Sequence, residues 1–518
     1  MKGPGGSAVP TRAGPRAGAH RRSATGRIGA LRTPRPAGHL GTVPSVKVTP
    51  DETGGDPLRP DGSPEDRPSR LDGMRDRAAP HRARLQGSEL AKTAGLAGAM
   101  VVSNAMALVA TLAFGRLLQV AEYGSLASLL SAFLILSVPG SALQAAVARE
   151  GALGHLGTGR DLSATLTRWT RTLSVATIIV LILSVLGRQQ LANAIGVDQV
   201  WAAAATPTAA MLWMLLSIER GVLQSQQMYR TVGTSMIAEQ VGRLFFGVIL
   251  AAAGLGATGA FLGTPLTMLA VTIVVGIRLH RALGPERTDA PPHRLRDLIR
   301  NGWVPIVGLM MIAILQNIDV IVAKHQLSPN AAGAYAAAAV ASKVVIWIAV
   351  GIGLYLLPEA TRRHAEGLDA RPVFVRALGV ISAVAVPALI IFAVAPDLVI
   401  KLGFGAKYLA GADVLLILGV AMSMLAITYL GVQYLLALHR SLFLAALSAI
   451  AIAEPFLLVL VSGDGSLTDF AWTVLGVQTV AMVYILAASL LAGRAEPLTS
   501  DEPFIPEADA PPAQAAVR

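Results

Sequence analysis

The sequence contains about twelve apolar stretches of roughly 18–25 residues each, which alternate with short polar connections between Thr93 and Ala492. A helix rises about 1.5 Å per residue, so a stretch of this length crosses the hydrocarbon core of a bilayer. A dozen such stretches in succession are not expected in a soluble protein. The pattern therefore predicts an all-α polytopic membrane protein.

The composition agrees with this fold class and excludes several others. Hydrophobic residues make up 53% of the chain and charged residues 14%. The net charge of +11 does not predict a nucleic-acid partner, because the arginines gather in the N-terminal tail and on alternate connections. The chain has no cysteine, which excludes disulfides, cysteine metal sites and thiol catalysis.

The sequence divides into two tails, two lobes and a linker. Residues 1–88 are rich in Gly, Pro, Ala and Arg and predict a disordered basic cytoplasmic tail, within which Met74 is an alternative start. We expect an N-terminal six-helix lobe at 89–280, a cytoplasmic linker at 281–301, a C-terminal six-helix lobe at 302–493 and a second disordered tail at 494–518. The expected membrane helices are Thr93–Phe114, Gly124–Val147, Trp169–Leu186, Val200–Ile218, Val232–Ala253, Thr258–Ile277, Val304–Ala323, Gly333–Leu357, Leu378–Ala395, Val414–Leu436, Leu442–Ser462 and Phe470–Ala492.

Basic residues predict the orientation in the membrane. One set of connections is rich in arginine, and the opposite set is poor in basic residues. Since positively charged connections stay in the cytoplasm, we expect the arginine-rich side and both termini to be cytoplasmic, in the cell membrane. The richer side holds Arg149, Arg160, Arg168, Arg171, Arg220, Arg230, Arg278, Arg281, Arg287, Arg294, Arg296, Arg300, Arg362, Arg363, Arg371, Arg376 and Arg440, whereas the other holds Arg116, Arg188, Lys324, Lys401 and Lys407.

The two halves of the sequence show a weak similarity to each other. Leu118 and Gly124 flank the start of the second expected helix, and Leu327 and Gly333 occupy the same register before the eighth. With six helices in each half, both copies enter the membrane in the same direction. The sequence therefore predicts lobes related by a pseudo-two-fold axis along the membrane normal, with a substrate path between them.

Charged side chains inside the expected helices are the strongest indications of a site. Each costs about 2.5–3.5 kcal/mol at the bilayer centre, so it faces either a partner or a wet cavity. Arg243, Lys343 and Glu454 fall near the centres of their helices, and Asp319 lies about 7 Å outward of centre, counting helical rise. Lys343 lacks an opposite charge on its own helix, so it either lines a cavity or pairs with Asp319 or Glu454.

The acidic residues leave alternatives open. Glu239 and Arg243 are four residues apart and can pair, either as a structural unit or as a pair whose arginine engages an anionic headgroup. Asp319 follows two amides, and its carboxylate could carry a coupling proton or sodium ion or could close a packing network. Glu454 precedes Pro455, which bends the helix, and is another candidate ion site.

Other motifs of catalysis and cofactor binding are missing or out of context. Gly254, Gly256 and Gly259 spell a dinucleotide fingerprint, but they fall in a short outward turn between two membrane helices rather than after a strand. The sequence contains no Walker A motif, no nucleophile-elbow serine and no histidine spacing suited to zinc. We expect no cofactor, no metal and no enzymatic activity.

Three segments resemble the polysaccharide and oligosaccharide flippases, a family within the superfamily that also holds multidrug exporters and the lipid II flippase. Residues 113–124 (AFGRLLQVAEYG) are similar to that family's signature at the first-to-second helix junction, and residues 220–227 (RGVLQSQQ) to its motif before the fifth helix. Asp319, Gly333, Tyr335, Lys343 and Pro358 resemble its seventh and eighth helices. The chain departs from the pattern at Gln119-Val120 and at Ser225.

The resemblance implies alternating access by two lobes, which carry a polyprenyl-linked saccharide from the cytoplasmic to the outer leaflet. By this analogy Arg116, Arg243 and Lys343 would contact sugar or pyrophosphate, because cationic donors suit phosphate oxygens. Asp319, Glu239 and Glu454 would be the ion-coupling residues, with H⁺ or Na⁺ as the ion. The implied partners are the lipid-linked substrate, membrane lipid and polysaccharide-assembly proteins.

Three other functions compete with the flippase. A cation-coupled exporter of small amphiphiles would be expected to hold several acidic residues in its first lobe, where Glu239 is the one clear candidate. A membrane-bound saccharide polymerase or ligase would need a large outward loop, but the longest here, 396–413, is short. A non-transporting scaffold would have no use for charges within the membrane.

Overall fold

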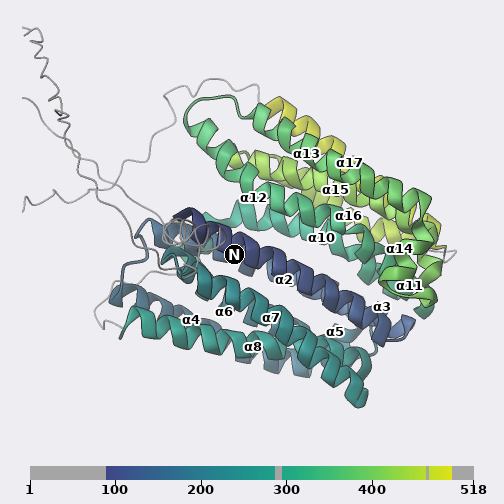
Figure 1. Ribbon diagram of the computed structural model, residues 1–518, viewed down its shortest axis with the longest axis horizontal. Coiled ribbons are helices and arrows are strands. Elements are labelled where there is room, and N and C mark those ends of the chain that lie inside the picture. Colours follow the sequence, from purple (N-terminus) through teal and green to yellow (C-terminus); the bar gives the residue numbers. More distant parts are fainter. Residues whose placement is uncertain (1–88, 286–294, 462–465, 493–518) are drawn as a thin grey trace, which may run out of the picture. The chain divides into compact units, whose positions relative to one another are not determined.

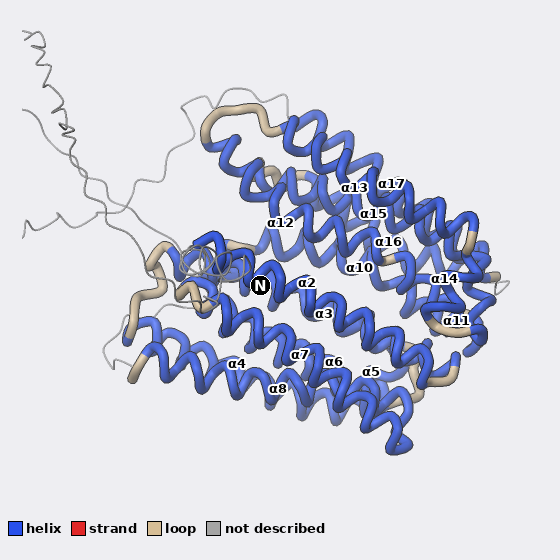
Figure 2. The backbone as a smooth tube through the Cα atoms, viewed as in Figure 1, coloured by secondary structure: helices blue, strands red, loops and turns tan. Residues whose placement is uncertain are grey.

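The computed structural model describes residues 89–285, 295–461 and 466–492, and every element in these ranges is helical (Figures 1 and 2). The expected tails, 1–88 and 494–518, and the middle of the expected linker lie outside the described residues. The sequence-based prediction of an all-α fold is confirmed for the part of the chain that the structure describes.

The first lobe packs around its fourth long helix. That helix, α6 (Val200–Ser225), contacts α3, α4 and α8, while α2 and α8 both pack on α7. A short helix, α5 (Arg188–Ile195), precedes α6. The other long helices of the lobe are α2 (Glu89–Leu117), α3 (Val120–Ala152), α4 (Arg160–Leu186), α7 (Tyr229–Leu250) and α8 (Gly256–Leu283).

The second lobe follows the same plan. Its most enclosed helix is α15 (Ala412–Ala437), which contacts α11, α12, α13 and α17. A short helix, α14 (Pro396–Gly403), and the turn η2 (Ala406–Gly411) precede it, as α5 precedes α6. This parallel is consistent with repeated lobes. The remaining elements are α9 (Leu295–Asn301), α10 (Trp303–Gln326), α11 (Pro329–Ser342), α12 (Val344–Ala365), α13 (Arg371–Val394), α16 (Phe443–Val461) and α17 (Leu467–Ala492).

Eleven described segments are long and apolar enough to cross a membrane, and one of them holds two crossings. This segment, Tyr229–Leu283, is 55 residues long and reverses at the π-helical turn η1 (Ala251–Leu255), so that α7 and α8 pack against each other. Gly254 (φ 95°) and Gly256 (φ 50°) adopt backbone conformations that L side chains rarely take. The expected glycine turn and the count of about twelve crossings are thus confirmed.

One crossing is broken at a predicted site residue. The eighth crossing consists of α11 and α12, which are separated at Lys343, whose amide lies 3.3 Å from the carbonyl oxygens of both Ala339 and Val340. Because such a shared bond loosens the regular ladder, the helix can change direction at this residue. The side chain of Lys343 therefore projects from the break between α11 and α12.

The lobes meet where α3 packs against α10 and α11. Gly124 and Gly333, the glycines of the weak similarity between the halves, face each other there: a Cβ on Gly124 would lie 3.1 Å from the Cα of Gly333. A Cβ on Gly333 would overlap the carbonyl group of Val120. Only glycines allow the two backbones to approach this closely.

We call the end of the lobes that carries this contact the closed end; it is defined by Arg116, Gly124, Gly333, Lys407 and Tyr408. Hydrogen bonds cross between the lobes here. The Tyr408 hydroxyl donates to the Gly115 carbonyl at 2.9 Å, Lys407 donates to the carbonyls of Arg116 and Leu118, and Arg116 donates to that of Leu402. Arg116 and Lys407, two of the charged residues expected on the outer side of the membrane, thus form hydrogen bonds between the lobes.

Candidate functional site

A cavity of about 330 Å³ lies between the lobes, bounded by α2, α3 and α7 on one side and by α10, α11 and α12 on the other. Its lining combines aromatic and aliphatic side chains with amides, hydroxyls and two cations. No aspartate or glutamate is among the described residues that line it. The polar and charged lining residues are Asn104, Thr111, Tyr123, Ser131, Gln240, Arg243, Gln316, Asn317 and Lys343.

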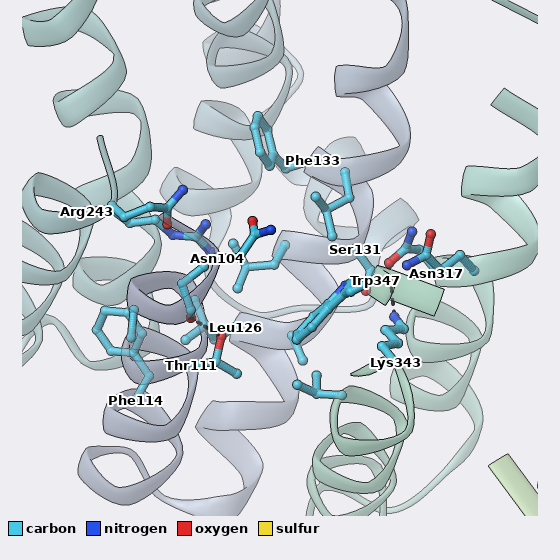
Figure 3. Close-up of a pocket in the computed structure, with 18 of the residues that line it drawn as sticks. Asn104, Thr111, Phe114, Leu126, Ser131, Phe133, Arg243, Asn317, Lys343 and Trp347 are labelled. Atoms are coloured by element: carbon cyan, nitrogen blue, oxygen red, sulfur yellow. Dashed lines mark hydrogen bonds between the residues drawn. The ribbon is translucent and has the colours of Figure 1, made fainter. Parts of the chain in front are cut away.

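Arg243 supplies the cation of the first lobe. It projects from α7 into the cavity, on the side opposite Lys343 in the view of Figure 3. Within the described part of the chain its guanidinium has neither a hydrogen bond nor an ion pair. All five of its donors are therefore available to a ligand.

Lys343 supplies the cation of the second lobe and is held by a neighbour. Its Nζ donates to Oδ1 of Asn317 on α10 at 3.0 Å, a bond drawn in Figure 3. Asn317 also donates from Nδ2 to the Ala313 carbonyl at 2.9 Å, which fixes the orientation of the amide. An ammonium has three donors, so two remain for another ligand.

Asp319 lies behind the cavity wall and is fully buried. Its Oδ2 accepts a hydrogen bond from the Tyr335 hydroxyl at 2.8 Å, whereas its Oδ1 has no partner. Asp319 lies on α10 and interacts electrostatically with Lys343, which lies at the break between α11 and α12. The arrangement leaves one carboxylate oxygen free to bind a proton or a small cation.

Glu454 extends this buried network. Its Oε1 lies 3.4 Å from Nε2 of Gln478, its Oε2 has no partner, and the residue is fully buried. Gln478 also donates to the Leu315 carbonyl at 2.7 Å, while its own Oε1 is unpartnered. Three unpartnered oxygens, on Asp319, Glu454 and Gln478, therefore lie buried within one lobe.

Two predicted site residues lie elsewhere than expected. Arg116 does not line the cavity but contacts the Leu402 carbonyl at the closed end, because it occupies the last turn of α2, beyond the cavity. Glu239 does not pair with Arg243 four residues away; its Oε2 lies 2.9 Å from Nη2 of Arg220 on α6. The structure brings Arg243 and Lys343 to one cavity and places Asp319 and Glu454 together behind it.

Sequence reasoning missed several residues around the site. The arginine pattern places Arg220 in a cytoplasmic connection, but α6 extends past it and the residue is 1% exposed. Glu219, its neighbour in sequence, is also buried and has an unpartnered Oε2. Asn104, Gln240 and Trp347 line the cavity but carry no charge that would mark them within an apolar stretch.

Comparisons with known proteins agree on a family and a fold. A family model described as a polysaccharide biosynthesis protein matches residues 113–413. No curated protein sequence matches the chain. The structure resembles an inward-facing multidrug resistance MATE family transporter of the MOP superfamily (TM-score 0.63, 12% identity, 76% of this chain and 98% of that one).

Two further solved structures share the fold. The lipid II flippase MurJ in an inward closed conformation gives a TM-score of 0.60 at 12% identity, over 76% of this chain and 87% of that one. A MOP superfamily transporter from Pyrococcus furiosus gives 0.55 at 13% identity, over 79% of this chain and 97% of that one. The helices described above are therefore arranged as in these three solved structures.

Proposed function

The chain belongs to the polysaccharide biosynthesis protein family, and we propose that it is a flippase that moves a lipid-linked saccharide precursor across the cytoplasmic membrane by alternating access. The observation that carries this proposal is the cavity between the lobes, whose charged lining residues are Arg243 and Lys343. Two cations without a lining carboxylate favour a ligand with an anionic group, such as the pyrophosphate of a polyprenyl-linked sugar.

The rest of the lining suits a saccharide. Amides at Asn104, Gln240, Gln316 and Asn317 can exchange hydrogen bonds with sugar hydroxyls, and Trp347 offers an aromatic face. The polyprenyl chain would remain in lipid. In this proposal the closed end faces the outer side, so its contacts shut the cavity there, and both termini are cytoplasmic, as the distribution of arginines predicts.

A coupling ion would bind behind the cavity. Asp319 and Glu454 are buried and each has a free carboxylate oxygen, so H⁺ or Na⁺ is a suitable ligand for them. Glu239 already has a cationic partner in Arg220, which leaves the coupling role to the second lobe. Lys343 would link ligand binding to ion binding, since it lines the cavity and also interacts with Asp319.

The proposal is tested by replacing each cavity cation in cells that depend on this chain for surface polysaccharide. Arg243→Ala and Lys343→Ala should each abolish the polymer while the protein remains folded and inserted. Arg278→Ala removes an exposed arginine from α8 and is the matched control, with export expected to be normal. Normal export in both cavity variants would contradict the proposal.

Two alternative functions make different predictions. A cation-coupled exporter of small amphiphiles would be favoured by several acidic residues in the first lobe, and none of the described residues that line the cavity is acidic. A saccharide polymerase or ligase would leave a covalently extended product. Purified protein reconstituted with lipid-linked precursor should therefore move the precursor between leaflets and leave its mass unchanged.

A further inference from the structure

A buried ion pair lies in the first lobe beside the cavity but outside its lining. Arg220 on α6 is 1% exposed, and its Nη2 lies 2.9 Å from Oε2 of Glu239 on α7. Its Nε donates to Oγ of Ser235 at 2.9 Å, and its guanidinium lies 5.6 Å from the centre of the Trp213 ring. Three side chains thus hold Arg220 in one orientation.

The partner of this pair could otherwise neutralise the cavity. Glu239 and Arg243 lie one helical turn apart on α7, the spacing at which a carboxylate and a guanidinium pair on a helix surface. Glu239 also acts electrostatically on Arg243. In the structure, however, the carboxylate points to Arg220, and Arg243 keeps its donors free in the cavity.

We propose that Arg220 is a positioning residue that holds Glu239 away from Arg243 and thereby keeps the cavity cationic for an anionic ligand. Arg220 itself touches no ligand in this scheme. Without its charge, Glu239 would turn to Arg243, the cation one turn away on α7 with which it already interacts electrostatically. The cavity would then present one free cation instead of two, although no lining residue had changed.

This inference rests on the proposed function, because it assumes an anionic headgroup in the cavity. The probe is farnesyl pyrophosphate, a soluble polyprenyl pyrophosphate, with farnesol as its uncharged counterpart. Binding is measured by calorimetry on the full chain purified in detergent. Arg243→Gln gives the reference loss of affinity, and Arg230→Gln, an exposed arginine on the same helix, is the control for lost charge alone.

Three variants decide the inference. Arg220→Gln should weaken binding of farnesyl pyrophosphate about tenfold, approaching the loss in Arg243→Gln. Glu239→Gln should bind at least as tightly as the wild type, because it removes the competing carboxylate. The double variant Arg220→Gln/Glu239→Gln should recover wild-type affinity to within about twofold. A purely structural role for Arg220 would weaken the binding of farnesol and of farnesyl pyrophosphate alike, whereas the positioning role weakens only the binding of the pyrophosphate.

A conservative variant covers the case in which Arg220→Gln does not fold. Arg220→Lys retains the positive charge but loses the planar fork that binds Ser235 and Glu239 together. It should weaken binding about threefold, and Arg220→Lys/Glu239→Gln should restore it. Wild-type affinity in a folded Arg220→Gln or Arg220→Lys variant would overturn the inference, and so would a double variant that stays as weak as the single one.

The experiment separates this inference from the function on which it rests. If the wild type binds farnesyl pyrophosphate no more tightly than farnesol, the anionic ligand is wrong and both proposals fall. If the wild type prefers the pyrophosphate and Arg243→Gln loses that preference while the Arg220 variants do not, only the positioning role is wrong.

Discussion

The two lobes each place one cation in the cavity but support it differently. Arg243 in the first lobe has no partner among the described residues, because the acid one turn away is bound to Arg220. Lys343 in the second lobe bonds to Asn317 and interacts with the buried Asp319. The first lobe therefore offers a cation without a hydrogen-bonded partner, whereas the cation of the second lobe belongs to a network that a coupling ion would alter under the proposed function.

This difference suggests that Arg243 and Lys343 have different roles in ligand binding and in folding. A cation with no partner contributes to ligand binding and little to folding. A cation that balances buried carboxylates contributes to both, and its availability to a ligand depends on the state of those carboxylates. Variants that remove one charge from each lobe can test this comparison.

The largest effect on stability is expected at the buried pair that frees Arg243. Arg220→Met should lower the free energy of unfolding by about 3–5 kcal/mol, because it removes the buried partner of Glu239 and pairing with Arg243 offsets only part of that loss. The measurement is reversible unfolding by SDS titration in mixed micelles. Arg220→Met/Glu239→Leu should regain most of the loss, and a single variant as stable as the wild type would show that the pair is not buried as described.

Arg243 and Lys343 should contribute differently to the free energy of unfolding in the same assay. Lys343→Met should cost about 2–3 kcal/mol, because Asp319 loses its nearest positive charge and Asn317 loses a donor. Arg243→Met should cost less than about 1 kcal/mol, since its guanidinium makes no hydrogen bond or ion pair with a described residue. Adding Asp319→Asn to Lys343→Met should reduce the loss. Equal costs for the two methionine variants would contradict the proposed difference between the lobes.

A smaller difference is expected at the glycines of the closed end. Gly333→Ala should cost about 1–3 kcal/mol in the closed state, because its Cβ would overlap the Val120 carbonyl. Gly124→Ala should cost less, since its Cβ would lie 3.1 Å from the Gly333 backbone. The chain has no cysteine, so labelling of Ser131→Cys by an impermeant thiol reagent reports opening from outside.

Gly333→Ala is expected to increase that labelling by about fivefold or more, and Gly124→Ala by less. The same reagent applied to Ser131→Cys alone is the baseline. Unchanged labelling in Gly333→Ala would show that the contact between α3 and α11 does not keep the cavity closed at this end.

The sequence predicted the features that depend on local pattern. Apolar length gave the crossings, and Gly254 and Gly256 marked the reversal between α7 and α8 because a turn of this kind needs positive φ. Charge within an apolar stretch singled out Arg243 and Lys343, which the structure places at the cavity. These inferences need only the cost of a charge in lipid and the rise of a helix.

Partners chosen through tertiary packing could not be predicted in this way. Helical spacing suggested that Glu239 pairs with Arg243, but the packing of α6 beside α7 brings Arg220 closer. The arginine pattern places Arg220 in a connection, since nothing local shows that α6 continues past it. The break at Lys343 occurs without a proline or glycine, and Trp347 carries no charge that would mark it as a residue of the cavity.

The central claim is that cations from both lobes bind an anionic headgroup in one shared cavity. The most direct measurement is the affinity of the purified chain for farnesyl pyrophosphate relative to farnesol, in the wild type, Arg243→Gln, Lys343→Gln and the variant that combines them. We expect a clear preference for the pyrophosphate, reduced about tenfold by each single change and lost in the combination. Equal affinity for both compounds, or a preference that survives the loss of both cations, would contradict the account.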